Sequence, residues 1–403
     1  MIYKKYKLSD VAKVEISSVD KKTKDGETHV KLCNFTDVYH NWAITTEMAD
    51  NFMEATANAR EIEKFTIRKG QVAFTKDSET RDDIGIPTYI ADDFENVLLG
   101  YHCALITPDE SKLSGKYLNA FMHSDYIQKY FELNATGSGM RYTLSLETLQ
   151  SMPLLLPSLE EQKAIGDLFS SIDRKIALNR SINQNLEALA KQLYDYWFVQ
   201  FDFPNENGQP YKSNGGKMVW NEYLKREIPK DWFVANYKEL FTIGNGKTMP
   251  QIYGVFPAYG GNGKVKDVGE SNYGPCIIIG RVGANCGSIH YSNVPCWVSD
   301  NAIAVCPIID SWQPYLYYSL KLFNLAKNKG GSSQPLITHM TLKNLYFPIS
   351  KEIVEKYACI ANCLQNLIYS NQIEIIQLTK QRDKLLPLLM NGQVSLNSDL
   401  SNG

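Results

Sequence analysis

Apolar residues recur at alternating intervals of three and four over one long stretch of the chain. The positions are Ile165, Leu168, Ile172, Ile182, Leu186, Leu189 and Leu193. This spacing is that of a coiled-coil seam, so it predicts one continuous helix over residues 157–199. Ser158 and Glu161 match the capping-box pattern that marks a helix start. Lys175 and Asn179 interrupt the stripe, and a buried asparagine in a seam fixes helix register at a cost in stability.

The same pattern returns 192 positions further along the chain, with Ser350 as its N-cap. Ile349 and Val354 flank this cap with the spacing of a hydrophobic staple. The repeated seam positions are Ile360, Leu364, Leu367, Asn371, Leu378 and Leu385. The asparagine recurs at the same point of the stripe, so cap, phase and polar interruption are all repeated. We predict a second helix over residues 348–393, followed by a flexible tail over residues 394–403.

Two helices of this length need a surface on which to bury their apolar stripes, because a lone amphipathic helix is unstable in water. About 40 residues at 1.5 Å per residue give each helix a length of about 60 Å. The simplest arrangement packs the two helices on each other, antiparallel about a pseudo-twofold axis, with Asn179 opposite Asn371. The alternative is that each helix packs separately on its own domain.

The segments before the two helices differ in sequence. Residues 1–156 mix strand and helix signals, whereas residues 200–347 begin as a linker rich in Gly, Pro and Asn and continue as a glycine-rich, β-like stretch. Directly before each helix the halves agree again in a Gly/Ser turn, a Leu-x-x-Leu step and a strand that contains proline. The predicted fold class is α+β, with two globular domains of mixed α/β structure and twisted sheets, separated by two long antiparallel coiled-coil helices.

Composition sets limits on this picture. The chain has 403 residues, of which 44% are hydrophobic and 21% charged, as expected for a folded protein of two or three domains. The net charge of −2 does not by itself indicate nucleic acid, although residues 217–335 carry 12 Lys+Arg against 8 Asp+Glu. We found neither an apolar run of about 18 residues nor a signal-peptide pattern at the start. We therefore expect a cytoplasmic protein with no membrane contact.

Four of the eight cysteines are spaced ten residues apart: Cys276, Cys286, Cys296 and Cys306. Structural zinc sites usually pair their ligands within two to four residues, because a tight turn must direct both sulfur atoms at one ion. Only Cys359 and Cys363 are that close, and they would lie on one face of a helix. We expect reduced, mostly buried thiols and no metal site.

Motifs for catalysis are missing from the sequence. The string "GNGKT" (244–248) resembles a phosphate-binding loop, but Phe241 replaces its first glycine and Pro250 prevents a following helix. There is no N/D-P-P-Y/F methyltransferase motif, and the six histidines have no nearby nucleophile. We therefore expect a recognition protein without a catalytic site or a cofactor of its own.

A set of strings, in this order, resembles the specificity subunit of type I restriction–modification systems over essentially the whole chain. They are "KLCNFTDVY" (31–39), "EIEKFTIRKGQVAFTKDSE" (61–79), "PLLLPSLEEQKAIGDLFSSID" (153–173), "FDFPNENGQPYKSNGGKMVWNEYLKREIPKDW" (201–232), "YGGNG" (259–263), "IIIGRVG" (277–283) and "WVSDNA" (297–302). The resemblance implies that residues 1–156 and the domain within 200–347 are target-recognition domains. Each would read one half of a bipartite DNA site, and the coiled coil would set the spacing.

The resemblance also implies partners. These are double-stranded DNA, two methyltransferase subunits docked on the coiled coil, and restriction/translocase subunits. Adenine-N6 methylation with S-adenosylmethionine, and cleavage with ATP and Mg, would belong to those partner subunits. The second helix lacks the P-L-x-E-Q signature of the first, so the two docking surfaces would differ. The alternative is a cytosolic coiled-coil adaptor whose domains bind proteins.

Basic residues near glycines and strand ends are the candidate DNA contacts. In the first domain the candidates are Lys64, Arg68, Lys69, Thr75, Lys76, Arg81, Arg141 and Tyr142. In the second domain they are Lys247, Lys264, Lys266, Arg281, Lys327 and Lys329. The strand-like "CIIIG" (276–280) would present Arg281 at its end. Lys247, Lys264, Lys266 and Arg281 stand among glycines and asparagines, with little acidic neutralisation expected around them. The alternative for Lys76 and Arg81, which flank the acidic "DSET", is a solvated surface held by ion pairs.

Overall fold

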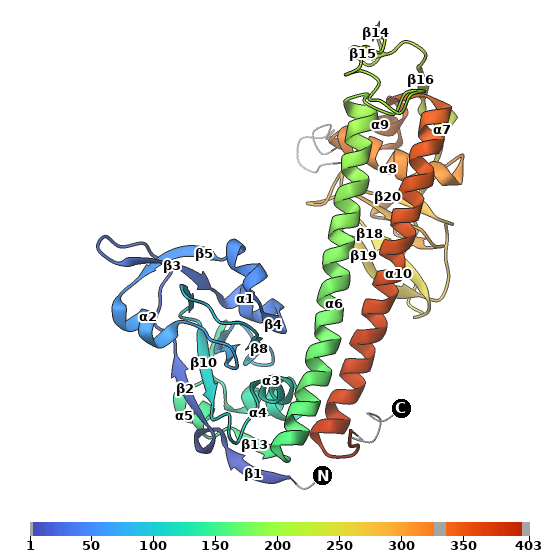
Figure 1. The fold of residues 1–403 in the computed structure, drawn as a ribbon. Coiled ribbons are helices and arrows are strands. Elements are labelled where there is room, and N and C mark those ends of the chain that lie inside the picture. Colours follow the sequence, from blue (N-terminus) through green and yellow to red (C-terminus); the bar gives the residue numbers. More distant parts are fainter. Residues whose placement is uncertain (1–2, 326–335, 397–403) are drawn as a thin grey trace, which may run out of the picture. The chain divides into compact units, whose positions relative to one another are not determined.

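The computed structural model describes residues 3–325 and 336–396, which form two compact units (Figure 1). The first unit comprises Met1–Leu178 with Glu374–Gly403, and the second comprises Asn179–Ile373. Both are mixtures of strands and helices, and each contains one part of both long helices. The predicted fold class is confirmed. Within the described residues, no helix is long and apolar enough to cross a membrane.

The first unit is built around a five-stranded sheet. Its strands lie in the order β2 (Ala12–Ile16), β10 (Cys103–Pro108), β6 (Val72–Thr75), β8 (Pro87–Ile90) and β4 (Ala43–Ile44). All four residues of β6 are buried because alternate side chains enter two different cores. Val72 and Phe74 face the core under α3 (Gly115–Met122), while Ala73 faces a core on the other side. A continuous apolar run therefore marks an interior strand covered on both faces.

Two three-stranded sheets, one pair of strands and several helices complete the first unit. The sheets are β5 (Met53–Ala57), β3 (Thr28–Cys33) and β9 (Val97–Leu99), and β11 (Thr136–Ser138), β12 (Arg141–Thr143) and β7 (Asp77–Ser78). The strand pair β1 (Lys4–Lys7) and β13 (Pro153–Leu156) is antiparallel. The helices are α1 (Phe35–His40), α2 (Ala59–Phe65), α4 (Asp125–Asn134) and α5 (Leu146–Gln150).

The second unit has a four-stranded sheet in the order β17 (Phe241–Asn245), β23 (Ala302–Pro307), β20 (Cys276–Gly280) and β21 (Ile289–Ser292). A three-stranded sheet consists of β19 (Gly263–Val268), β18 (Phe256–Gly260) and β22 (Trp297–Val298). The other elements are the strand pairs β14 (Met218–Asn221) with β15 (Arg226–Pro229) and β16 (Phe233–Asn236) with β24 (Tyr346–Ile349), and helices α7 (Tyr237–Leu240), α8 (Gln313–Leu322) and α9 (His339–Lys343). Lys327 and Lys329 lie outside the described residues.

The two units share a frame that their sequences do not reveal. In both, a strand lies between two antiparallel neighbours: β10 between β2 and β6, and β23 between β17 and β20. In both, a buried tyrosine on the next helix donates its hydroxyl to the strand before a long helix. Tyr117 donates to the Leu155 carbonyl at 2.6 Å and Tyr315 to the Pro348 carbonyl at 2.8 Å. The internal repeat therefore extends upstream of the long helices.

The long helices are α6 (Leu159–Tyr194), which continues into a π-turn (Asp195–Val199), and α10 (Lys351–Met390). The predicted capping box is confirmed, since Glu161 accepts from the Ser158 amide at 3.0 Å and donates its own amide to the Ser158 hydroxyl. Gln162, which follows in the signature of the first helix, is buried and bonds the Lys112 carbonyl and the Ser114 amide. These two signature residues therefore hold the helix start inside the first unit.

The two helices pack on each other and run antiparallel, as predicted (Figure 1). In the second unit the Tyr357 hydroxyl donates to the Ala190 carbonyl at 3.2 Å, and Asn183 donates to the Ile368 carbonyl at 3.4 Å. In the first unit, Ile165 near the start of α6 shares a core with Leu389 near the end of α10. The alternative of separate packing is excluded for the described residues.

The seam positions need correction. Ile165, Ile172 and Asn179 are buried, and seven other predicted positions are half-buried: Leu168, Leu186, Leu193, Leu364, Asn371, Leu378 and Leu385. The prediction is wrong for four residues that are 37–55% exposed: Ile182, Leu189, Ile360 and Leu367. The buried positions lie one residue further along each helix, at Asn183, Ala190, Ala361 and Ile368. One residue rotates a helical face by about 100°.

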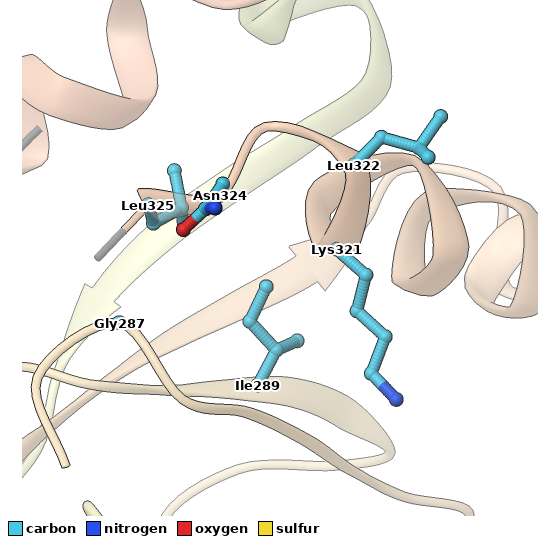
Figure 2. A pocket seen from close by; sticks show the side chains of 6 residues that line it. All are labelled: Gly287, Ile289, Lys321, Leu322, Asn324 and Leu325. Carbon is cyan, nitrogen blue, oxygen red and sulfur yellow. The ribbon is translucent and has the colours of Figure 1, made fainter. Parts of the chain in front are cut away.

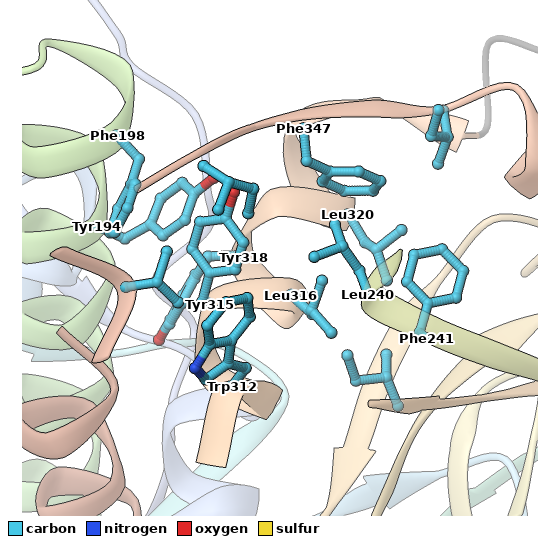
Figure 3. Packing of buried hydrophobic residues seen from close by; sticks show 14 of the residues in the cluster. Tyr194, Phe198, Leu240, Phe241, Trp312, Tyr315, Leu316, Tyr318, Leu320 and Phe347 are labelled. Atoms are coloured by element: carbon cyan, nitrogen blue, oxygen red, sulfur yellow. The ribbon is translucent and has the colours of Figure 1, made fainter. Parts of the chain in front are cut away.

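The asparagine pair also differs from the prediction. Asn371 donates to the side-chain oxygen of Asn183 at 2.9 Å, so its partner lies one turn further along α6 than Asn179. Helix α6 and its π-turn also contribute to the aromatic core of the second unit, where Tyr194 and Phe198 pack against Tyr315 of α8 (Figure 3). Helix α6 must turn its face toward this core as well as toward α10.

All eight cysteines are free thiols, and five of them are buried. Three of the four evenly spaced cysteines gather between the two sheets of the second unit, with the sulfur atoms of Cys276 and Cys296 separated by 3.7 Å and Cys306 packed beside them. Within residues 3–325 and 336–396, no group of three or more His, Cys, Asp or Glu side chains has the geometry to hold a metal ion.

Candidate nucleic-acid interface

One basic residue has the same place in both units, directly after an interior strand. Lys76 follows β6, and its amide donates to the His102 carbonyl at 3.0 Å. Arg281 follows β20, and its amide donates to the Asn301 carbonyl at 2.9 Å. We name this place the strand-end position. Sequence reasoning found both residues separately, but only the structure shows that they are equivalent.

The carbonyl groups of the two residues are matched as well. Lys76 accepts from the amide of Leu144 at 2.9 Å, and Arg281 accepts from the amide of Ile337 at 3.0 Å. Each partner precedes a short helix, α5 or α9, that leads to the strand before a long helix. The backbone at the strand-end position is therefore fixed on both sides, so a difference between the units must come from side chains.

In the first unit the strand-end side chain is neutralised. The Lys76 ammonium lies 2.7 and 2.9 Å from the two carboxylate oxygens of Asp77, which His102 contacts through Nδ1 at 2.8 Å. Burial alone would raise the pKa of Asp77, but hydrogen bonds from Lys76, Thr143 and His102 outweigh burial and lower that pKa. Both the Lys76 and Asp77 side chains are only 16% exposed. The geometry therefore points against the predicted DNA contact of Lys76.

In the second unit the charge of the strand-end side chain is not neutralised by an acidic neighbour within the described residues. Arg281 is half-buried and forms no ion pair within the described part of the chain. The loop that follows folds back on β20, since Gly287 donates to the Gly280 carbonyl at 2.8 Å and Gly280 donates to the Ser288 carbonyl at 2.9 Å. A side chain at Gly280 would strike the backbone of Asn285, so this close return requires glycine.

Another prediction for the first unit is wrong. Thr75 is fully buried, and its hydroxyl accepts a hydrogen bond from the Ile86 amide at 3.0 Å. A residue inside a strand with both faces covered cannot reach DNA. The sequence pattern placed it beside basic residues but did not reveal which way its side chain points.

Three candidates of the first unit lie in acidic surroundings. Lys64 forms an ion pair with Glu15 at 3.4 Å. Arg68 lines a pocket of about 490 Å³ with three acidic residues, Glu63, Asp93 and Glu95. Lys69 donates its backbone amide to Asp93 at 3.1 Å, while its side chain is exposed. These neighbouring carboxylates weaken the attraction of this region for a phosphate backbone.

The remaining candidates of the first unit come together at the sheet of β7, β11 and β12. The guanidinium group of Arg81 lies over the ring of Tyr142 at 5.3 Å. Tyr142 is paired with Ser78 across the ladder, and Arg141 is exposed beside it. This sheet therefore presents two exposed guanidinium groups next to the neutralised strand-end position.

In the second unit the other candidate lysines differ in whether a ring or an acidic side chain contacts the ammonium group. Lys247 is exposed, and the Lys266 ammonium lies over the ring of Tyr253 at 5.4 Å. Lys264 forms an ion pair with Asp267 at 2.7 Å, so the expectation of little acidic neutralisation is wrong at that residue. Of the basic candidates in the described residues of this unit, Arg281 is the one at a strand end.

A cation that the sequence analysis missed lies beside the loop of Arg281. Lys321 of α8 lines a pocket of about 400 Å³ whose other lining residues are Gly287, Ile289, Leu322, Asn324 and Leu325 (Figure 2). The Lys321 ammonium lies over the ring of Tyr317 at 4.4 Å. Nothing in the local sequence marks this lysine, because it belongs to a helix remote in sequence from the glycine-rich loop.

The two long helices carry an apolar stripe that the seam does not use. In the second unit Ile182, Leu189 and Tyr196 follow one another at seven-residue intervals along α6 and its π-turn, and they are 37–50% exposed. Ile360 and Leu367 have the same spacing on α10 and are 42% and 55% exposed. Side chains of this size exposed in rows form an apolar surface along the two helices.

Comparisons with known proteins agree that this chain is similar to specificity subunits of type I restriction–modification systems. A family model described as a type I restriction modification DNA specificity domain matches residues 3–188 and 229–382. The type I restriction enzyme MjaIX specificity subunit of Methanocaldococcus jannaschii is 25% identical over 323 residues, 72% of this chain and 71% of the relative. The HindI specificity subunit of Haemophilus influenzae is 27% identical over 201 residues, 50% of this chain but only 41% of the relative. The crystal structure of the S subunit of a type I system from M. genitalium has the same fold, with a TM-score of 0.63 and 19% identity over 96% of both chains.

Proposed function

Because the chain belongs to the family of type I restriction–modification DNA specificity domains, we propose that it is the sequence-specificity subunit of such a system. Each unit reads one half of a bipartite site in double-stranded DNA, and the paired helices α6 and α10 set the spacing of the halves. The chain itself is non-catalytic. Adenine-N6 methylation with S-adenosylmethionine belongs to methyltransferase subunits, and cleavage with ATP and Mg belongs to restriction/translocase subunits.

The observation that carries this proposal is the shared strand-end position. The two units share one frame, but Lys76 is paired with Asp77 whereas Arg281 has no ion pair within the described residues, so the two units present different chemistry to two half-sites of different sequence. A single domain distinguishes few base pairs, since one bidentate contact contributes about 1–3 kcal/mol of discrimination. Two linked domains combine their discrimination energies, because once the first domain is bound the second meets its half-site at a high effective concentration.

The exposed apolar stripe supports the proposed docking of methyltransferase subunits on the long helices. Leu189 and Leu367 have no role in the seam and are among the more exposed leucines of the second unit. A helical partner could pack against these rows at the same spacing. Glu161 and Gln162 of the first helix are engaged inside the first unit, so the lost signature of the second helix does not by itself make the docking surfaces unequal.

Sequencing of DNA methylation in cells with and without this gene tests the proposal. We expect a methylated motif of two defined parts and a fixed gap to disappear from cells that lack the gene and to return on complementation. Persistence of every two-part motif in the deleted strain would contradict the proposal.

Salt dependence separates this function from the adaptor alternative. Bound to its methyltransferase partner, the chain should bind duplex DNA with an affinity that falls steeply between 50 and 200 mM salt, because phosphate contacts release counterions. A protein adaptor would show no such dependence and no preference for the methylated motif.

A further inference from the structure

The hairpin of β11 and β12 in the first unit combines a fixed root with an exposed tip. At the root, Thr143 pairs with Asp77 and Tyr142 pairs with Ser78, so the hairpin extends the strand that follows Lys76. Leu144, the next residue, is buried in the core of the first unit. Asp77 is in turn held by Lys76 and His102. The neutralised strand-end position therefore acts as the anchor of this hairpin.

The tip is a two-residue turn of Gly139 and Met140 that follows the last pair, Ser138 with Arg141. Gly139 has a φ of 73°, and nothing lies within 4 Å of where its side chain would begin. Met140 is 81% exposed, in a strand pair whose first strand is exposed at every residue. A large apolar side chain held out at the tip of a hairpin whose root is paired is available for burial against a partner.

Charge indicates what kind of partner this is. Arg141 is exposed next to Met140, and Arg81 lies over the ring of Tyr142 one residue further on. Glu79 and Asp82 flank Arg81 in sequence, but neither forms an ion pair with it within the described residues. An apolar tip with guanidinium groups behind it matches stacked bases between two rows of phosphates better than it matches an apolar pocket on a protein.

We propose that this hairpin enters the minor groove of the half-site read by the first unit and that Met140 wedges between two adjacent base pairs. This inference rests on the proposed function. Apolar wedges of this kind partly unstack a base step and kink the duplex. The unbranched methionine side chain and its polarisable sulfur are suited to contact with aromatic faces. Arg141 and Arg81 contact the phosphates on either side. Lys76 contributes by holding Asp77, and so the hairpin, in place.

The test measures DNA bending by the complete complex of this chain with its methyltransferase partner. The probe is a duplex that carries the two-part motif found by methylation sequencing, with a fluorescent donor and acceptor at its ends. With wild-type protein, energy transfer should rise on binding. With Met140→Ala the rise should be largely lost and the affinity should fall on the order of tenfold. Met140→Leu, which keeps an apolar wedge, should preserve the bend.

Arg141→Ala is the matched control on the same hairpin. Loss of one phosphate contact should weaken binding at all sequences and reduce the salt slope by about one, while the bend is kept. A bend unchanged by Met140→Ala would overturn the wedge. If Met140→Ala instead impaired assembly with the methyltransferase and left DNA binding intact, the hairpin would be a protein contact and the proposal would be wrong. Failure of the wedge leaves intact the finding that a two-part motif is lost when the gene is deleted, whereas failure of the proposed function means that no two-part motif is lost on deletion.

Discussion

Lys76 and Arg281 have equivalent backbone hydrogen bonds at the same place in two related frames, but the two charges differ in whether an acidic side chain pairs with them. The Lys76 ammonium is held between the oxygens of Asp77 and is largely buried, whereas Arg281 has no ion pair within residues 3–325 and 336–396. The frame fixes where a basic residue is placed, and the neighbouring side chains decide whether its charge is available to DNA.

The residue that follows each basic side chain accounts for the difference. Lys76 is followed by Asp77, which begins β7 and continues into the ladder with β12. Arg281 is followed by Val282, which makes one bridge to Leu336 and has no charge to offer. Because the carboxylate of Asp77 pairs with the Lys76 ammonium, this lysine stabilises the local structure and is not available for a DNA contact. Two half-sites can therefore be read by different chemistry without a change of fold.

The largest effect is expected from Arg281→Ala. If Arg281 contacts a base edge, its loss removes about 1–3 kcal/mol of discrimination at one position of one half-site. Methylation sequencing should then show a motif relaxed at that position, with the other half-site unchanged. Lys76→Ala is the comparison at the equivalent place: because Lys76 holds Asp77 and the hairpin rather than a base, its loss should weaken binding without relaxing the motif at any base position.

Either of two opposite results would contradict the assignment of Arg281 to a base and of Lys76 to a structural role. An unchanged motif with Arg281→Ala, together with weaker binding at all sequences, would make Arg281 a phosphate contact. A relaxed motif with Lys76→Ala would show that the ion pair with Asp77 opens when DNA binds.

Much of the fold followed from the sequence because it depends on periodicity. The capping box at Ser158 and the antiparallel pairing of the long helices needed only an apolar stripe repeated twice. The exact seam could not be predicted, because a helix with apolar residues on two adjacent stripes can bury either. Helix α6 packs on the core around Tyr194 as well as on α10, and in this arrangement Asn183 is the residue that bonds Asn371.

The candidate interface was harder to predict because charge availability depends on contacts between segments remote in sequence. Nothing in the sequence near Lys76 shows that His102 would help hold Asp77 against it. Lys321 lies beside the loop of Arg281 only because α8 and that loop fold together. Thr75 was misplaced for a simpler reason, since it is the last residue of a strand with both faces covered.

The second prediction concerns Asp77→Asn. The substitution keeps the shape of the side chain but removes the charge that compensates Lys76, so the free energy of unfolding at pH 7 should fall by about 2 kcal/mol. Denaturant unfolding monitored by tryptophan fluorescence measures this value. The Ser78→Ala variant, one residue further along β7, is the control and should change it little.

The pH dependence of this effect has a defined sign. The pKa of Asp77 in the folded protein lies below its ordinary value of 3.8, so its stabilisation is complete at neutral pH and is lost as the pH falls through the folded pKa. The difference between wild type and Asp77→Asn should therefore shrink below about pH 4. A difference that stays constant down to pH 3 would mean that the lost stability comes from packing and not from the charge.

The smallest effect is expected from Lys321→Ala in the second unit. The Lys321 ammonium rests over Tyr317, and Lys321 lines the same pocket as Gly287 of the loop after Arg281, so we expect it to contact a phosphate of the half-site that the second unit reads. Its loss should reduce the salt slope of DNA binding by about one and the affinity a few-fold, with the motif unchanged. Lys264→Ala should alter neither, because Lys264 is already paired with Asp267 at 2.7 Å. Equal effects of the two substitutions would show that the local ion pair does not decide which lysines meet DNA, and the same reasoning would then fail for Lys76.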